Sequence, residues 1–131
     1  MFFSSNDSGQ KRDLALLHAV QLIFKANSNP SNFAKLGQDS FMKTLSGGLG
    51  RGNPLFYQKA ESMSELEMAS ILRKRSNFDK RSIAQTLSAA FHTTDKSQET
   101  IIVLIRIVED CDIPRDFLDF KIQELWQLHT N

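Results

Sequence analysis

Hydrophobic residues recur along this chain with the spacing of amphipathic helices. In the segment 11–26, Leu14, Leu17, Val20 and Phe24 follow one another at intervals of three or four residues. Such intervals place the four side chains on one face of a helix. Further apolar residues lie beside this face, so we expect a helix that is buried on more than one side.

Capping and turn signals divide the rest of the chain into shorter helices. Asn29-Pro30 and Asn53-Pro54 each place a capping residue before a proline, which is typical of a helix start. Ser64 opens a capping box of the form Ser-Glu-Leu-Glu. The expected elements are a short helix from Pro30 to Gly37, a short apolar turn from Phe41 that Gly47 closes, and helices that start at Pro54, Ser64, Asp79, Thr94 or Asp95, and Pro114.

The segment 96–110 is apolar nearly all round in its second half, which makes it the expected central helix. Its β-branched stretch 100–108 would also suit a strand. A helix is favoured because Asp95 and Gln98 supply a start signal and no other segment offers a matching partner strand. The first helix and the helix around Trp126 are expected to pack against it.

These elements together predict a single all-α domain. The chain has 131 residues, close to the commonest domain size. Its composition, 40% hydrophobic and 24% charged, is ordinary for a soluble globular protein. We expect six or seven helices over residues 11–128, preceded by a flexible N-terminus of residues 1–10.

No part of the sequence indicates export or a membrane. The first ten residues lack the apolar core of a secretory signal, and the longest apolar run, 101–108, is too short to span a bilayer. Cys111 is the one cysteine, so no intramolecular disulfide can form. Its acidic neighbours disfavour a reactive thiolate and predict a structural thiol. The expected location is the cytoplasm.

The near-neutral total charge conceals an uneven distribution. Residues 1–81 carry twelve bases against seven acids, a net charge of +5. Residues 82–131 carry four bases against eight acids, a net charge of −4. Such asymmetry bears on binding partners, or on how the two halves face each other, and not on chemistry.

A cluster of bases lies where one expected helix ends and the next begins. Asp79 is the one acid within this stretch. Such a cluster can bind an acidic protein or the phosphates of a nucleic acid, although a solvated corner without a partner is the simplest alternative. We call the cluster the basic corner, and it comprises Arg73, Lys74, Arg75, Lys80 and Arg81.

The glycine-rich segment 46–53, SGGLGRGN, is expected to be a flexible connector. A phosphate-binding P-loop would need GK followed by Ser or Thr after a buried strand, and this segment has neither. Arg51 could still help the backbone amides near Pro54 to hold an anion.

No group of residues has the spacing of a catalytic or metal site. His18, His92 and His129 do not stand at metal-ligand intervals. The acids from Asp110 to Asp119 lack the pattern of a calcium loop and suit a helix start instead. No nucleophile motif such as GxSxG occurs. We therefore expect no metal, no cofactor and no enzymatic activity.

Elimination leaves binding as the expected function. We expect a non-enzymatic cytosolic protein-binding module, such as an inhibitor, an immunity-type neutraliser or a regulatory adaptor, that acts through its charge-asymmetric surface. The alternative is a nucleic-acid-binding regulator that uses residues 73–81. A helix-turn-helix over 83–91 and 96 onward is a weak match, because its second helix is too apolar to expose a recognition face. We rank a protein partner first, self-association second and nucleic acid third, with no membrane.

Overall fold

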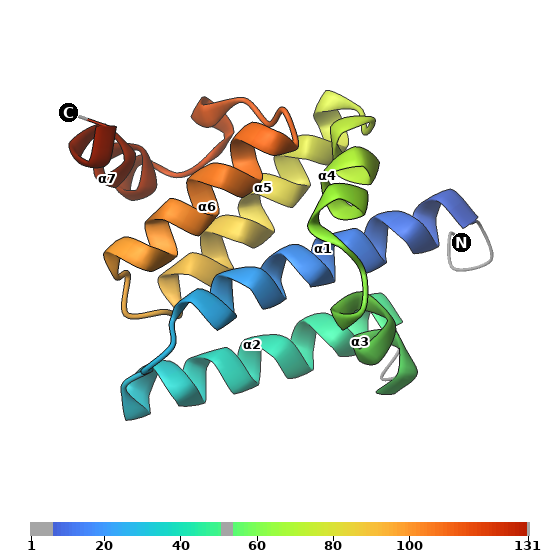
Figure 1. Ribbon diagram of the computed structural model, residues 1–131, viewed down its shortest axis with the longest axis horizontal. Coiled ribbons are helices and arrows are strands. Elements are labelled where there is room, and N and C mark those ends of the chain that lie inside the picture. The colour runs from blue at the N-terminus through green and yellow to red at the C-terminus, as the bar shows by residue number, and fades with distance from the viewer. Residues whose placement is uncertain (1–6, 51–53, 131) are drawn as a thin grey trace.

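The computed structural model describes residues 7–50 and 54–130 and shows an all-α fold (Figure 1). These residues form seven α-helices, one short 3-10 helix and no β-strand. The expected all-α domain of six or seven helices is confirmed. The helices are α1 (Asp7–Ala26), α2 (Asn32–Gly50), α3 (Pro54–Glu61), α4 (Glu65–Arg73), α5 (Asn77–His92), α6 (Gln98–Asp110) and α7 (Phe120–Thr130), with the 3-10 helix η2 at Arg115–Phe117.

Helix α1 lies in the middle of the fold, with α2 and α3 on one side and α4, α5 and α6 on the other (Figure 1). It contacts all five of these helices. Leu17, Val20 and Ile23 are completely buried. The prediction that the first helix is buried on more than one side is therefore confirmed.

Helix α6 is the second central element. It buries Ile101, Leu104 and Val108, among others, and packs against α1, α4, α5 and α7. The expected contacts with the first helix and with the Trp126 helix are present. The strand alternative for 100–108 is excluded. The centre of the fold is nevertheless shared by α1 and α6, because α1 contacts more of the other helices than α6 does.

Helix α2 is one continuous helix where the sequence predicts two short segments. Gly37, expected to end the first segment, lies inside it. A glycine within a helix costs about 1 kcal/mol relative to alanine. Phe41, Met42 and Leu45 pack against the core from this helix, and their burial holds the helix together through the glycine.

The flexible connector predicted over 46–53 is wrong for its first part. Residues 46–50 belong to the end of α2, so Gly47 does not close a turn. Leu49 packs against the core and fixes this end of the helix. Residues 51–53 lie outside the described residues, and the suggested anion contact of Arg51 stays a prediction.

Ser31 precedes α2 and caps it, in place of the predicted Asn29. Its hydroxyl accepts a hydrogen bond from the backbone N–H of Ala34 (3.1 Å) and donates one to Asp95 (2.7 Å). The backbone N–H of Ser31 donates to the second carboxylate oxygen of Asp95 (2.9 Å). These bonds hold the pKa of Asp95 below its ordinary value. They also tie the loop before α2 to the loop before α6.

Asp95 therefore binds Ser31 at the start of α2, and the prediction that Thr94 or Asp95 caps α6 is wrong. Ser97 caps α6 instead, since its side chain accepts from the backbone N–H of Thr100 (3.3 Å). Lys96, between Asp95 and Ser97, has a positive φ of 56°. This left-handed residue turns the chain, so that Asp95 binds Ser31 at the start of α2 while Ser97 caps α6.

Two other predicted helix starts are also displaced. Ser76 caps α5 in place of Asp79, whose backbone N–H donates to the Ser76 hydroxyl (3.2 Å). Pro114 precedes only the short η2, and α7 starts after Asp119, which accepts from the backbone N–H of Ile122 (3.0 Å). In both cases the cap is a short oxygen-bearing side chain three residues before the amide that it satisfies.

The remaining helix starts agree with the sequence or extend it. Helix α3 begins at Pro54, and the Ser64 hydroxyl accepts from the backbone N–H of Glu67 (3.1 Å), as the capping box requires. Helix α1 already begins at Asp7, so residues 7–10 of the expected flexible N-terminus are helical. Residues 1–6 lie outside the described part of the chain.

The packing of α6 predicts very different effects for two neighbouring substitutions. Leu104→Ala empties space around a fully buried side chain and should lower the free energy of unfolding by about 2–5 kcal/mol. Ile102→Ala, at a position 41% exposed on the same helix, should change it by less than about 1 kcal/mol. Urea denaturation followed by circular dichroism measures both. Equal losses would contradict the assignment of the buried face.

Candidate functional site

The turn between α4 and α5 brings the five bases of the basic corner onto one end of the fold. Helix α4 ends at Arg73, Lys74 is its C-cap, and Ser76 already caps α5. A helix end followed directly by a helix start is what the sequence predicts here. The five side chains nevertheless make different contacts, and only some of their charge is available to a partner.

Arg73 and Lys80 hold the end of α6. The Arg73 guanidinium donates two hydrogen bonds to the backbone oxygen of Asp110 (2.6 and 2.9 Å). The Lys80 ammonium donates one to the backbone oxygen of Asp112 (2.9 Å) and is almost completely buried. The last carbonyls of a helix lack partners within the helix and attract cations. These two bases are therefore explained by the fold.

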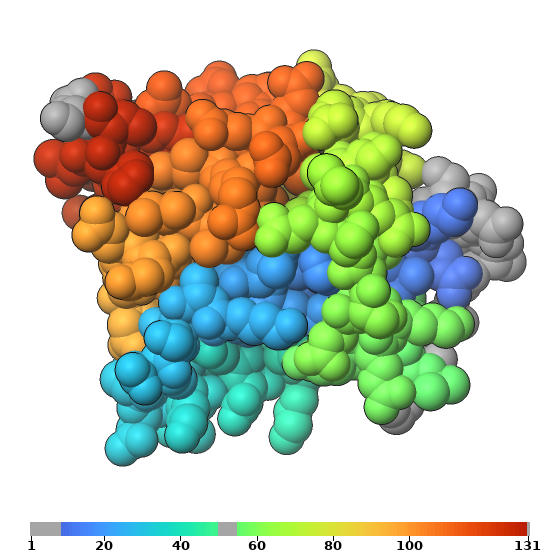
Figure 2. Space-filling view, in the orientation of Figure 1, coloured from blue at the N-terminus to red at the C-terminus, as the bar shows by residue number. Residues whose placement is uncertain are grey.

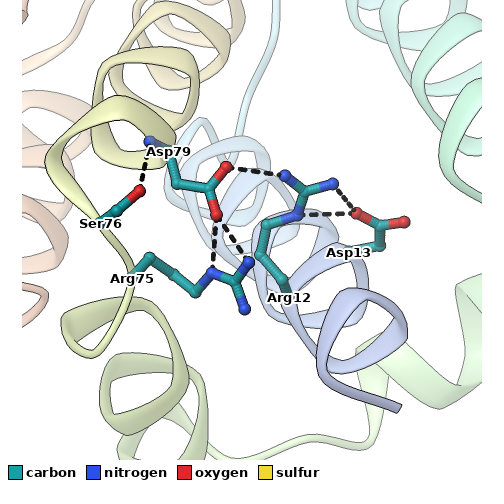
Figure 3. Close-up of polar contacts among 5 residues, drawn as sticks. All are labelled: Arg12, Asp13, Arg75, Ser76 and Asp79. Atoms are coloured by element: carbon teal, nitrogen blue, oxygen red, sulfur yellow. Dashed lines mark hydrogen bonds and ion pairs between the residues drawn. The ribbon is translucent and has the colours of Figure 1, made fainter. Parts of the chain in front are cut away.

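Arg75 belongs to a chain of alternating charges that joins α1 to α5 (Figure 3). Its guanidinium binds one carboxylate oxygen of Asp79 (2.7 Å), and Arg12 binds the other (3.1 Å). Arg12 also donates two hydrogen bonds to Asp13 (2.7 and 3.0 Å). Burial raises the pKa of Asp13, against the opposing effect of Arg12. The network therefore compensates a buried carboxylate and orients Arg75 at the surface.

Arg81 and Lys74, both exposed, make neither a hydrogen bond to a helix end nor an ion pair with another described residue. The Arg81 guanidinium lies over the ring of Phe117, 4.1 Å from the ring centroid, which is a cation–π contact. Lys74 has no ion pair or side-chain hydrogen bond to any residue in the described ranges. The five predicted bases thus divide into two that bind backbone oxygens, one in an ion-pair network, one stacked on a ring and one unpaired.

A groove of about 390 Å³ runs beside Lys74, between α1 and α4. Lys11 lies on its α1 wall, and Ser70, Ile71 and Arg75 complete the lining. Lys11, like Lys74, has no ionic partner within residues 7–50 and 54–130. Figure 2 shows the N-terminal end of α1 emerging beside α4. We call this groove, lined by Lys11, Ser70, Ile71, Lys74 and Arg75, the cationic groove.

Sequence reasoning did not single out two exposed residues, Lys11 and Phe78. Lys11 is distant from the basic corner in sequence, and no local pattern predicts that α1 passes beside the end of α4. Phe78 lies in the first turn of α5 and is 80% exposed. Its place in the polar stretch Ser-Asn-Phe-Asp was a usable signal for exposure, because its neighbours in the sequence are all polar.

Two of the three histidines singled out in the sequence have polar contacts. His18 Nδ1 lies 2.7 Å from the backbone oxygen of Ala60, and His92 lies 2.6 Å from Asp119. Burial, with a smaller contribution from Asp110, raises the pKa of Cys111 to about 12, so its thiol stays protonated. Among the described residues no group of three His, Cys, Asp or Glu side chains is placed to hold a metal ion.

No helix of the described chain combines the length and apolar character that crossing a membrane requires. Comparisons with protein-family models, with curated proteins and with solved structures find no match. The geometry of the surface is therefore what bears on function.

The contacts in the basic corner predict which bases stabilise the fold. Lys80→Met keeps the aliphatic stem but removes the charged donor to Asp112, and should lower the free energy of unfolding by about 1–2 kcal/mol. Lys74→Met removes an exposed cation and should change it by less than about 0.5 kcal/mol. Chemical denaturation compares the two. An equal effect of both variants would show that Lys80 does not hold the end of α6.

Proposed function

We propose that this chain is a non-enzymatic, cytoplasmic protein-binding module that docks an acidic segment of another protein in the cationic groove. The observation that carries the proposal is the pair Lys11 and Lys74, which come from α1 and α4 to the same groove. Each has no ionic partner among the described residues, whereas Arg73, Arg75 and Lys80 are engaged within the chain. Two unpaired cations on opposite walls offer complementary charge to a carboxylate-rich segment.

Exposed Phe78 supports a protein partner. It is 80% exposed in the first turn of α5, three residues along the chain from Arg75, which lines the charged groove. Interfaces between proteins combine aromatic anchors with charged groups that steer association. Inhibitors, immunity-type neutralisers and regulatory adaptors all act through such surfaces, and the proposal covers these three classes.

Nucleic acid is the less favoured partner because little of the corner's charge is free. A protein that binds duplex DNA mainly through its backbone neutralises several phosphates, roughly six to ten in strongly salt-dependent cases. Arg73 and Lys80 donate their hydrogen bonds to backbone oxygens at the end of α6 and just after it. The net charge of −4 over residues 82–131 would also repel a polyanion that extends beyond the groove.

Charge reversal in the groove tests the proposal. Affinity capture from a lysate of the source cells, with nuclease added, should recover a partner with an acidic segment on the wild-type protein. Lys11→Glu with Lys74→Glu should abolish that recovery, because it replaces attraction by repulsion at both walls. Quantitative mass spectrometry measures the recovery of each captured protein.

The matched control is Lys35→Glu with Lys43→Glu, which reverses the same number of charges at exposed positions of α2. This variant should capture the partner as well as wild type does. Recovery that survives reversal at Lys11 and Lys74 would refute the groove as the docking site. Tight, salt-sensitive gel shifts with random DNA or RNA would replace the protein partner by a nucleic acid.

A further inference from the structure

A separate pocket of about 250 Å³ lies where α1, α2 and α3 meet. Gln21 of α1, Gln38 of α2 and Tyr57 of α3 contribute to its lining. The volume is below the range of about 300–1,000 Å³ that is usual for drug-sized ligands, so the pocket suits a small molecule. It shares no lining residue with the cationic groove.

Two buried side-chain amide atoms, one from each of two glutamines that line this pocket, lack hydrogen-bond partners. Gln21 is 3% exposed, and its side-chain nitrogen donates to the backbone oxygen of Tyr57 (3.2 Å). Its side-chain oxygen has no partner, and neither has the side-chain nitrogen of Gln38. An unsatisfied buried polar atom destabilises a fold by about 1–3 kcal/mol. An acceptor and a donor without partners therefore stand at one small pocket.

Opposite charges and apolar side chains complete the lining. Lys25 of α1 and Asp39 of α2 are exposed, and neither has an ion pair with another described residue. Phe24 and Met42 supply apolar surface to the same pocket. The residues that line this pocket thus carry a cation, an anion, an unpaired amide oxygen and an unpaired amide nitrogen.

We propose that this pocket binds a small zwitterion that carries a carboxamide, the chemistry of free glutamine. The ligand's amide nitrogen donates to the Gln21 oxygen, and its amide oxygen accepts from the Gln38 nitrogen. Its ammonium group faces Asp39 and its carboxylate faces Lys25. This arrangement gives hydrogen-bond partners to the Gln21 oxygen and the Gln38 nitrogen, and ionic partners to Lys25 and Asp39.

The ligand reaches the amides through a small movement of Gln38. Both unpaired atoms are buried from solvent, while Gln38 as a residue is only half-buried. The terminal torsion of a glutamine side chain is broad, so the amide can turn toward the pocket without a backbone change. Water is the competing occupant, because water molecules can also satisfy one donor and one acceptor.

Titration of the ¹⁵N-labelled protein with L-glutamine tests the proposal. Two-dimensional ¹H–¹⁵N spectra should show saturable shifts in the side-chain amide signals of Gln21 and Gln38. L-glutamate, in which a carboxylate replaces the amide donor, should bind at least roughly tenfold more weakly. No saturable shift with L-glutamine, or equal binding of L-glutamate, would overturn the proposal and leave water in the pocket.

Substitutions within the pocket localise the binding. Gln38→Glu removes the donor with little change of shape and should weaken L-glutamine binding at least roughly tenfold. Gln58→Glu, at an exposed position of α3 outside the pocket lining, is the matched control and should bind as wild type does. Unchanged binding by Gln38→Glu would contradict the assigned contact.

A substitution at Asp39, an exposed residue of the pocket lining, keeps the test decisive if Gln38→Glu does not fold. Asp39→Asn alters an exposed side chain and should weaken L-glutamine binding roughly two- to fivefold, as expected for an exposed charge pair. Unchanged binding by a folded Asp39→Asn variant would refute the proposed orientation of the zwitterion. The result is independent of the cationic groove, since neither Lys11 nor Lys74 lines this pocket.

Discussion

The burial of α1 between two groups of helices is the constraint on which the rest of the structure depends. Its apolar residues meet five other helices, so no face of its middle part is left to water alone. Its buried polar residues must then find partners inside the protein. Asp13 accepts hydrogen bonds from Arg12, and His18 Nδ1 lies within hydrogen-bond distance of a backbone oxygen of α3. The side-chain nitrogen of Gln21 donates to another backbone oxygen of α3. These bonds position α3 against α1, and the Arg12 bridge to Asp79 positions α5.

Both proposed sites lie along α1 because of this arrangement. Lys11, near its start, faces the end of α4 and forms one wall of the cationic groove. Gln21, two to three turns further on, stands at the pocket formed with α2 and α3. A helix held on several sides is a rigid support for such residues, and rigid supports favour precise recognition. Two bases of the basic corner also acquire a structural reason, since Arg73 and Lys80 donate hydrogen bonds to backbone oxygens at the end of α6 and just after it.

The sequence was sufficient for the helical class and for the buried faces of α1 and α6, because the period of apolar residues depends only on local geometry. It was insufficient for several helix ends. Asp95 is a residue type that often caps helices and stands just before α6. It instead accepts hydrogen bonds from Ser31, the cap of α2, which is distant in the chain. The basic corner was correctly placed at a turn, yet which of its bases are free depends on the position of the α6 carbonyls. That position is a property of the packed fold.

Native-state hydrogen exchange tests the central role of α1 most directly. If α1 is the element on which the other helices pack, the amides of residues 15–23 should exchange only through global unfolding, with protection equal to the free energy of unfolding from denaturation. The amides of α7, which packs against α6 at one edge of the fold, should exchange faster through local opening. Exchange of residues 15–23 as fast as that of α7 would contradict the account.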